Sequence, residues 1–427
     1  MKTEIPREIK NIAEKLQKAN FQAYLVGGCV RDLLIGREPK DWDIATNAKP
    51  EEIQKIFPDS VYENKFGTVA VKSAISNQQS AISIVEITTF RLEGKYTDKR
   101  HPDEIKFAKT IEEDLARRDF TINAIAFNMG TSDVSNIDGD NRTSDVQNII
   151  DPFNGQNDIK NKTIRTVGNP EERFNEDALR LMRAVRFAVE LNFTIEKKTA
   201  LASFGLAGLL EVIAKERIRD EFIKILMTPR AEEGIQILED TGLLRYIIPE
   251  ICEGIGVGQN KHHIYTVWEH NLRALDYAAK NNYSLEIRLA ALLHDIGKPR
   301  TKAGEGLDST FYNHEIVGAK IAAQILDKLH FSRDIAEKVI HLVRYHLFYY
   351  NVGEVTEAGV RRFLRRVGPE NVEDFIKVRE ADRIGSGVPK AVPYKIRHLL
   401  FMIEKVKRDP ISPKMLKVNG EDVMKIL

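Results

Sequence analysis

Apolar and polar positions change their period part-way along the chain. Before about Pro170, short runs of β-branched and aromatic residues are typical of strands, at residues 21–26, 67–72 and 82–90. Helical patterns accompany them, and the first, over residues 6–19, places one apolar stripe on a helix: Ile9, Ile12, Ala13 and Leu16. After Pro170 the strand signals vanish and helical periods continue. The pattern predicts an α+β fold, with a mixed head followed by an all-helical body.

The head contains a strand, a two-glycine turn and a short helix within Leu25-Val26-Gly27-Gly28-Cys29-Val30-Arg31-Asp32. Glycine lets backbone N–H groups approach a phosphate, and the helix dipole with Arg31 adds positive charge. Asp41 and Asp43 follow at a spacing of two, which on a strand points both carboxylates to one face. Each motif alone is common as a plain turn or a solvated strand end. Together they favour a Mg²⁺-dependent nucleotide site.

Glu86 interrupts the apolar strand of residues 82–90. An acid in such a strand is more often an edge residue that faces water. If the strand lies beside Asp41 and Asp43, Glu86 instead completes the metal site. The residues leave both alternatives open.

A polar stretch follows this strand. Residues 91–113 predict a mobile loop of the kind that closes over a substrate, and residues 130–148 predict an exposed insertion or hairpin. Between them lies Arg117-Arg118-Asp119-Phe120-Thr121-Ile122-Asn123-Ala124. Adjacent arginines usually form a solvated face, but in a nucleotide site they hold triphosphate and ribose hydroxyls.

The first body helix is expected to run from Glu176 to Phe187, with Asp177 and Arg180 as surface neighbours. An ordinary salt bridge is the plain interpretation. A carboxylate beside a guanidinium also matches the amino donor and ring-nitrogen acceptor that cytosine and adenine share, and it rejects uracil and guanine. Arg183 continues that side, about 120° from Asp177, whereas Arg186 falls on the far face, where it can pair with Glu190.

These four motifs, in this order, resemble the class II tRNA nucleotidyltransferase and bacterial poly(A) polymerase family over about residues 20–190. The resemblance implies a polymerase-β-like head with a small mixed or antiparallel sheet, a neck helix that reads the incoming base, and a body that holds the acceptor arm of tRNA. The chain is expected to divide into a nucleotidyltransferase head, a helical neck and RNA-binding body, an HD-type helical metal domain (on the second pattern described below) and a helical tail: residues 1–168, 169–255, 256–390 and 391–427.

Roles carried over from the resemblance fall on the motif residues. Mg²⁺ would be bound by Asp41 and Asp43. Glu86 lies outside these motifs and stays a third catalytic candidate on the strand argument alone. Triphosphate contacts fall on Gly28 and Arg31, ribose contacts on Arg118 and Asp119, and base contacts on Asp177 and Arg180. Further nucleotide contacts fall on Arg183 and Arg186, which for Arg186 disagrees with its helical placement. The loop of residues 91–100 matches an element associated with adding the terminal A.

A second set of chemical residues lies farther along. His270, His294-Asp295 and Asp382 occur in that order, and residues 285–296 are apolar nearly all round, which predicts a buried helix that ends in a His-Asp pair. A buried His-Asp pair is costly unless it is hydrogen-bonded or binds metal. The order resembles the HD phosphohydrolase superfamily, which implies one divalent metal on these four residues and water activated on a phosphoester. His314 and His346 are candidates for a second metal or for phosphate.

Composition limits the remaining choices. The 427 residues are 42% hydrophobic and 30% charged, with a net charge of +1, so any nucleic-acid footprint must be local. One local candidate is a stripe of arginines that could equally be a solvated helix face: Arg361, Arg362, Arg365 and Arg366. Two cysteines, no signal peptide and no membrane-length apolar run predict a cytoplasmic protein without a membrane partner.

The sequence therefore predicts a template-independent CTP(ATP):tRNA nucleotidyltransferase that uses Mg²⁺ in the head and an unidentified divalent metal in the HD domain. Its partners would be tRNA, CTP and ATP. One alternative is a bacterial poly(A) polymerase with the same head. Another is an HD phosphohydrolase whose head only binds RNA.

Overall fold

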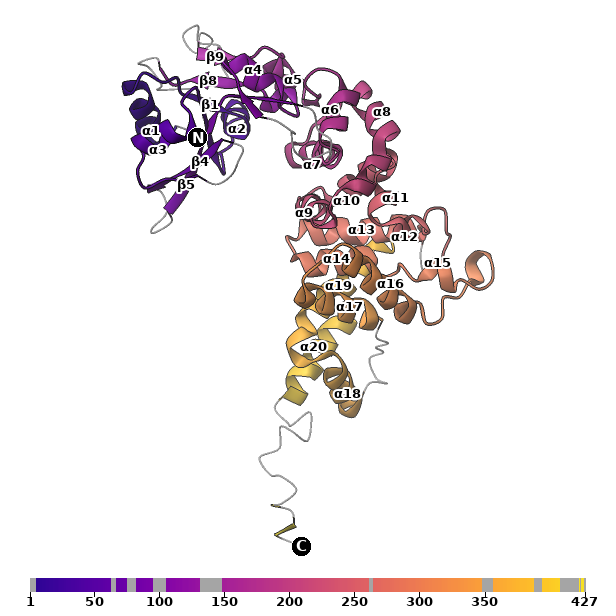
Figure 1. Ribbon diagram of the computed structural model, residues 1–427. Helices are drawn as coiled ribbons and strands as arrows, with labels where there is room; N and C mark the ends of the chain where they lie inside the picture. The colour runs from indigo at the N-terminus through magenta and orange to yellow at the C-terminus, as the bar shows by residue number, and fades with distance from the viewer. Residues whose placement is uncertain are drawn as a thin grey trace. The chain divides into compact units, whose positions relative to one another are not determined.

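The computed structural model describes residues 5–62, 67–74, 82–94, 105–130, 148–260, 264–347, 356–387 and 394–407, with residues 422, 424 and 425 (Figure 1). The chain forms two compact units, Met1–Ile213 and Ala214–Leu427. The predicted division between head and neck at residue 168 lies within the first unit.

A seven-stranded mixed sheet is the framework of the first unit, in the order β3-β4-β5-β2-β1-β8-β9. The strands are β1 (Tyr24–Val26), β2 (Trp42–Thr46), β3 (Val61–Tyr62), β4 (Thr68–Ala74), β5 (Ile82–Thr89), β8 (Ala126–Asn128) and β9 (Ile149–Ile150). Only the β2–β5 pair of this sheet is parallel. The predicted mixed head is confirmed, and two predicted strands appear as β4 and β5.

The two faces of the sheet have different cover. Helix α1 (Arg7–Lys18) buries its predicted stripe of Ile9, Ile12, Ala13 and Leu16, and with α3 (Pro50–Ile56) it packs on the face that carries Leu25, Ile44 and Ile87. Alternate residues of the same strands point to the opposite face. There Val26 and Ala45 pack with residues of α4 (Ile111–Ala116), and Asp43 and Glu86 lie on this second face by strand alternation.

The segment after β5 contains more regular structure than the sequence suggested. In place of a loop over residues 91–113, β6 (Arg91–Glu93) pairs antiparallel with β7 (Ile105–Phe107), and α4 begins at a capping box of Thr110 and Glu113. Residues 95–104 and 131–147, which hold the rest of the predicted loop and most of the predicted insertion, lie outside the described residues.

The neck is two helices, α6 (Pro170–Glu176) and α7 (Arg180–Leu191), and the prediction of one helix through Asp177 is wrong. Asp177 is extended, with φ −132° and ψ 106°, and its Oδ1 accepts a hydrogen bond from the Leu179 N–H at 3.1 Å. A short acidic side chain that caps the next turn competes with continuation of the helix. Strands also persist beyond Pro170, because β10 (Thr163–Ile164) pairs with β11 (Thr194–Ile195).

In its described residues, the second unit consists of helices and their connections, together with one isolated β-bridge between Ala303 and Thr310. Its central helix, α14 (Leu285–Leu293), is buried over Ile287–Leu293 and packs against several neighbours: α9 (Lys215–Leu226), α13 (Val267–Lys280), α17 (Arg333–Tyr345) and α19 (Val372–Gly385). The predicted buried helix is confirmed, and His294 and Asp295 follow directly after its last turn. Within the described ranges, no helix has the length and apolarity needed to cross a membrane.

Candidate functional site

The two-glycine turn brings the first predicted site together. Gly27 has a φ of +76°, a left-handed conformation that favours glycine, and it directly precedes α2 (Gly28–Leu34). A Cβ at Gly27 would lie 2.7 Å from Nη1 of Arg118 and 3.6 Å from Oδ2 of Asp43. The turn, an acid of β2 and an arginine that follows α4 therefore meet at one point. Any side chain at Gly27 would displace Arg118.

The predicted metal acids lie around β2. Asp43 is half-buried within the strand, whereas Asp41 is exposed and precedes the strand by one residue. Glu86 of β5 stands opposite Asp43 in parallel register, so both side chains share one face. Strand β5 lies between β4 and β2, so Glu86 is not on an edge strand, but its side chain is exposed, as the alternative of a water-facing acid expected.

The charges around Asp43 set its protonation. Burial raises the pKa of the Asp43 carboxyl, Arg118 lowers it, and the neighbouring Asp41 raises it again. Like charges at short range favour the protonated form until a cation arrives between them. Asp41 and Asp43 thus place two negative charges near one another, although the described side chains of Asp41, Asp43 and Glu86 do not bring three ligand atoms as close together as the histidine cluster of the helical unit does.

Asp114 organises the adjacent arginines, and the sequence analysis missed it. Its buried carboxylate accepts from Arg117 at 2.8 Å and from Arg118 at 3.4 Å. These arginines hold the pKa of Asp114 below its usual range against the effect of burial. The spacing of three and four residues on α4 was the available signal, because such pairs are neighbours on a helix.

Asp119 faces the neck. It accepts from the Arg183 Nε at 2.8 Å, from the Phe120 N–H at 2.8 Å and from the Asn123 side chain at 3.3 Å. Burial alone would raise the pKa of Asp119, but Arg183 and Arg180 hold it well below its usual range. The predicted ribose residue is therefore tied to a predicted nucleotide-contacting arginine.

The backbone N–H of Arg180 donates to the Asp177 carbonyl oxygen at 3.0 Å, and other residues hold the Arg180 guanidinium. Its Nη1 donates to Oε2 of Glu176 at 2.5 Å and to the Arg173 carbonyl oxygen at 3.0 Å, and its Nη2 donates to the Arg117 carbonyl oxygen at 3.2 Å. Because Asp177 stands at the junction between α6 and α7, the helical angles reckoned from it do not hold. Both residues nevertheless remain at the start of α7.

The other two predicted arginines are also held. Arg31 is buried and donates to Asp32 at 2.9 Å and to Asn123 at 2.8 Å. Arg186 pairs with Glu190 at 3.5 Å, as its spacing of four predicted.

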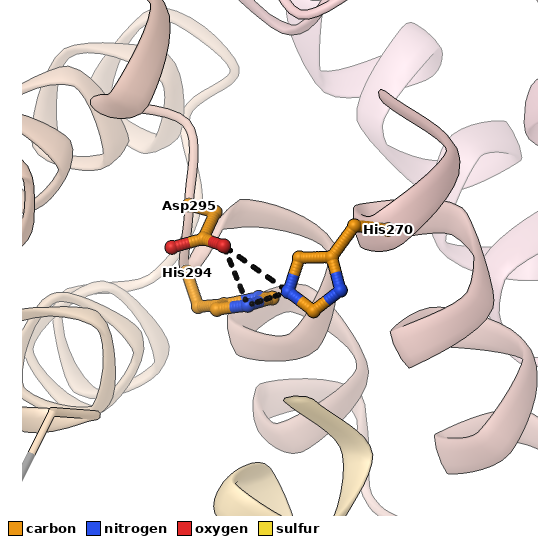
Figure 2. Close-up of side chains that lie close together, drawn as sticks. All are labelled: His270, His294 and Asp295. Atoms are coloured by element: carbon orange, nitrogen blue, oxygen red, sulfur yellow. Dashed lines mark hydrogen bonds and ion pairs between the residues drawn. The ribbon is translucent and has the colours of Figure 1, made fainter. Parts of the chain in front are cut away.

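The second predicted site is a buried cluster in the helical unit, part of which Figure 2 shows. His270 comes from α13, and its Nε2 lies 2.9 Å from Nε2 of His294, 3.1 Å from Oδ2 of Asp295 and 3.3 Å from Oδ1 of Asp382. His294 Nε2 lies 3.3 Å from the same Asp295 oxygen. All four predicted metal residues converge, and their nitrogen and oxygen donors fit a divalent metal.

Two further histidines extend this cluster on the other side of Asp295. Nε2 of His314 and of His346 lie 3.2 Å and 3.7 Å from Oδ1 of Asp295. In His294, His314 and His346 the Nδ1 atom approaches a backbone carbonyl oxygen, at 2.8, 2.6 and 2.7 Å. Donation from Nδ1 leaves Nε2 as the ligand atom. Asp295 is therefore shared by two groups of three residues whose ligand atoms could hold a metal ion.

Backbone packing and charge shape the cluster. A Cβ at Gly297 would lie 2.2 Å from the His314 carbonyl oxygen, so only glycine lets the start of α16 (His314–Lys328) approach. Lys298 Nζ lies 2.6 Å from Oδ2 of Asp295. Burial lowers the pKa of His294, but Asp295 and Asp382 raise it to about 10, so these carboxylates favour a positive charge at this position.

Comparison with known proteins identifies these parts. Residues 23–165 match the Poly A polymerase head domain, residues 192–255 the probable RNA and SrmB-binding site of polymerase A, and residues 267–384 the HD domain. The crystal structure of the Bacillus stearothermophilus CCA-adding enzyme in complex with CTP is 30% identical, with a TM-score of 0.68, over 98% of this chain and 87% of that chain. The chain belongs to the CCA-adding enzyme family.

Curated relatives of the family agree. The CCA-adding enzyme of Lactococcus lactis subsp. lactis is 46% identical over 56% of this chain, and that of Streptococcus mutans is 46% identical over 54%. These matches span 56% and 52% of the relatives' own lengths. The Thermotoga maritima CCA-adding enzyme complexed with tRNA shares the fold, with a TM-score of 0.56 at 20% identity. Nucleotidyltransferase and HD domains generally depend on divalent metals.

Proposed function

We propose that this chain adds CMP and AMP to the 3′ end of tRNA without a template and releases pyrophosphate. The observation that carries the proposal is the meeting of Gly27, Asp43 and Arg118 on a sheet face that also carries Glu86. Membership of the CCA-adding enzyme family and the CTP named in the Bacillus structure support the choice of nucleotides.

In this reaction the terminal 3′-hydroxyl of tRNA attacks the α-phosphorus of the nucleotide, and the bond to pyrophosphate breaks. Asp41 and Asp43 would hold Mg²⁺, with Glu86 as a third oxygen donor. The bound ion supplies charge neutralisation and alignment of the attacking hydroxyl. Arg118, held by Asp114 and adjacent to Asp43, offers a cation to the departing phosphates.

Selection of the base is assigned to the neck. Asp177 and Arg180 offer an acceptor and a donor at the start of α7, a combination that suits cytosine and adenine. Support for a fixed reader comes from the three hydrogen bonds that hold the Arg180 guanidinium. A rigid pair discriminates by leaving mismatched donors or acceptors unsatisfied.

A tRNA transcript that lacks its terminal CCA, supplied with labelled CTP and ATP separately and together, tests the proposal. We expect two CMP additions with CTP alone and completion only when ATP is present. Long A tails without CMP incorporation would replace the proposal with poly(A) addition. Absence of any addition, with intact CTP binding, would reject nucleotidyl transfer altogether.

A second activity, hydrolysis of phosphoesters in the HD domain, is favoured by the buried histidine and aspartate cluster. A divalent metal held there would activate water for attack on phosphorus. The buried Nε2 atoms of His314 and His346 lie 3.2 Å and 3.7 Å from Oδ1 of Asp295, a grouping of two nitrogens and one oxygen that a divalent metal could bridge. Turnover of p-nitrophenyl phosphate and its bis ester with Mg²⁺, Mn²⁺ or Ni²⁺ tests this activity.

A further inference from the structure

Three arginines gather around one aromatic ring. Phe187 of α7 is 4% exposed, and its ring centroid lies 4.2 Å from the guanidinium carbon of Arg186 and 5.3 Å from those of Arg31 and Arg183. Guanidinium groups repel one another, whereas the face of an aromatic ring attracts each of them. The ring is therefore a common contact for three cations that would otherwise separate.

Each of these cations has its own acid. Arg31 pairs with Asp32 at 2.9 Å, Arg183 with Asp119 at 2.8 Å and Arg186 with Glu190 at 3.5 Å. Loss of the aromatic ring would consequently leave no arginine without a counter-charge. What it would remove is the shared surface that fixes the guanidinium planes relative to one another.

The ring also joins two parts of the nucleotide site. Arg31 belongs to α2, which follows the two-glycine turn, whereas Arg183 and Arg186 belong to α7, whose first residue is Arg180. Phe187 further meets the ring of Phe120 edge-on at 5.7 Å, and the Phe120 N–H donates to Asp119, the partner of Arg183. The contacts form a closed path through Phe187, Phe120, Asp119 and Arg183.

We propose that Phe187 is a positioning residue for the incoming nucleotide: its ring holds the helix after the phosphate turn and the base-reading helix in one fixed relation through Arg31, Arg183 and Arg186. This inference rests on the proposed nucleotidyl transfer. Phe187 is buried and acts through the arginines. Its effect should appear in nucleotide affinity and choice, while tRNA affinity stays unchanged.

Steady-state kinetics and calorimetry of Phe187→Leu in the full chain provide the test. We expect KM for CTP and ATP, and the dissociation constant for CTP with Mg²⁺, to rise about tenfold. KM for tRNA should stay within about twofold. The use of UTP relative to CTP should increase, because Arg180, the proposed base reader, is the first residue of the helix that Phe187 positions. Phe187→Tyr, which keeps the ring, should restore nucleotide affinity to within about threefold of the wild type.

Phe193→Leu is the matched control, because Phe193 is 6% exposed and follows α7 outside the arginine cluster. Equal rises in KM for CTP in the two leucine variants would overturn the inference, as would an unchanged CTP affinity in Phe187→Leu. If Phe187→Leu does not fold, Phe187→Met replaces it with the same expectations. Direct CTP binding separates this inference from nucleotidyl transfer, since a wild type that binds CTP without adding it refutes only the proposed reaction.

Discussion

The candidate metal ligands of the head and of the helical unit differ in their burial and in their chemical type. In the head, Asp41 and Glu86 are exposed, Asp43 is half-buried, and the donors are carboxylates alone. In the helical unit, His270, His294 and Asp295 are buried with their ligand atoms within 4.8 Å of one another. Exposed carboxylates leave coordination positions for water and phosphate oxygens, as Mg²⁺ prefers. From this difference we expect an ion in the head to arrive with the nucleotide, and an ion in the buried cluster, if one binds there, to exchange more slowly.

The sharpest test of this comparison is Asp43→Ala, for which we expect nucleotide incorporation to fall by at least about a thousandfold. The exposed Asp41 and Glu86 would then lack the carboxylate that lies beside the glycine turn. Incorporation of labelled CMP into tRNA lacking CCA measures the loss. Circular dichroism should be unchanged, and phosphoester hydrolysis should persist. A folded variant that still incorporates CMP would contradict the role of Asp43.

The reciprocal change, Asp295→Asn, should lower phosphoester hydrolysis about a hundredfold, because Asp295 contacts both groups of histidines. Elemental analysis of the purified protein should show loss of bound divalent metal. CMP incorporation is the internal control and should stay within about twofold of the wild type. A variant that retains its metal would show that Asp295 serves packing alone.

Asp119→Asn should destabilise the first unit by about 2 kcal/mol, because it removes the buried carboxylate that pairs with the partly buried Arg183. The folded-state pKa of Asp119 is depressed below an unfolded value of about 3.9. The stabilisation that ionised Asp119 provides is therefore complete above about pH 5. It is lost progressively as the pH falls below the unfolded-state pKa toward the lower folded-state pKa. Urea unfolding curves of wild type and variant should converge with acid. A difference that does not vary with pH would exclude this ion pair as the cause.

The smallest expected change is for Glu86→Gln, with incorporation reduced about tenfold. Glu86 stands in register with Asp43 but is more exposed, so an amide there keeps one oxygen donor and loses the charge. A shift of the Mg²⁺ concentration needed for half-maximal rate distinguishes a metal role from a packing role. An unchanged Mg²⁺ requirement would leave Asp41 and Asp43 as the complete set of acids.

Local patterns were sufficient for much of the architecture. The α1 stripe, strands β4 and β5 and the buried α14 all follow from the spacing of apolar residues, because burial selects one face of a helix or strand. The neck was mispredicted at Asp177, since its side chain caps the following turn and helical periodicity does not record where a cap interrupts it.

In the candidate sites too, some residues could be predicted from local spacing and others could not. Spacing singled out Asp43 and His294-Asp295, but the register that brings Glu86 opposite Asp43 depends on the parallel pairing of β2 with β5. Phe187 owes its proposed role to Arg31, which a distant segment supplies, whereas the pair of Asp114 and Arg118 is local and could have been predicted from its spacing of four residues. Contacts between distant segments are not encoded in the local pattern of either segment.

The absence of a side chain at Gly297 determines how closely His314 can approach the other residues of the buried cluster. A single added methyl group would push the first turn of α16 outward, and His314 would retreat from Asp295 with it. Such a chain would keep His270, His294 and Asp382 around Asp295 and lose one member of the second trio. One codon change at position 297 would thus disturb the group of Asp295, His314 and His346 and leave the group of His270, His294 and Asp295 in place.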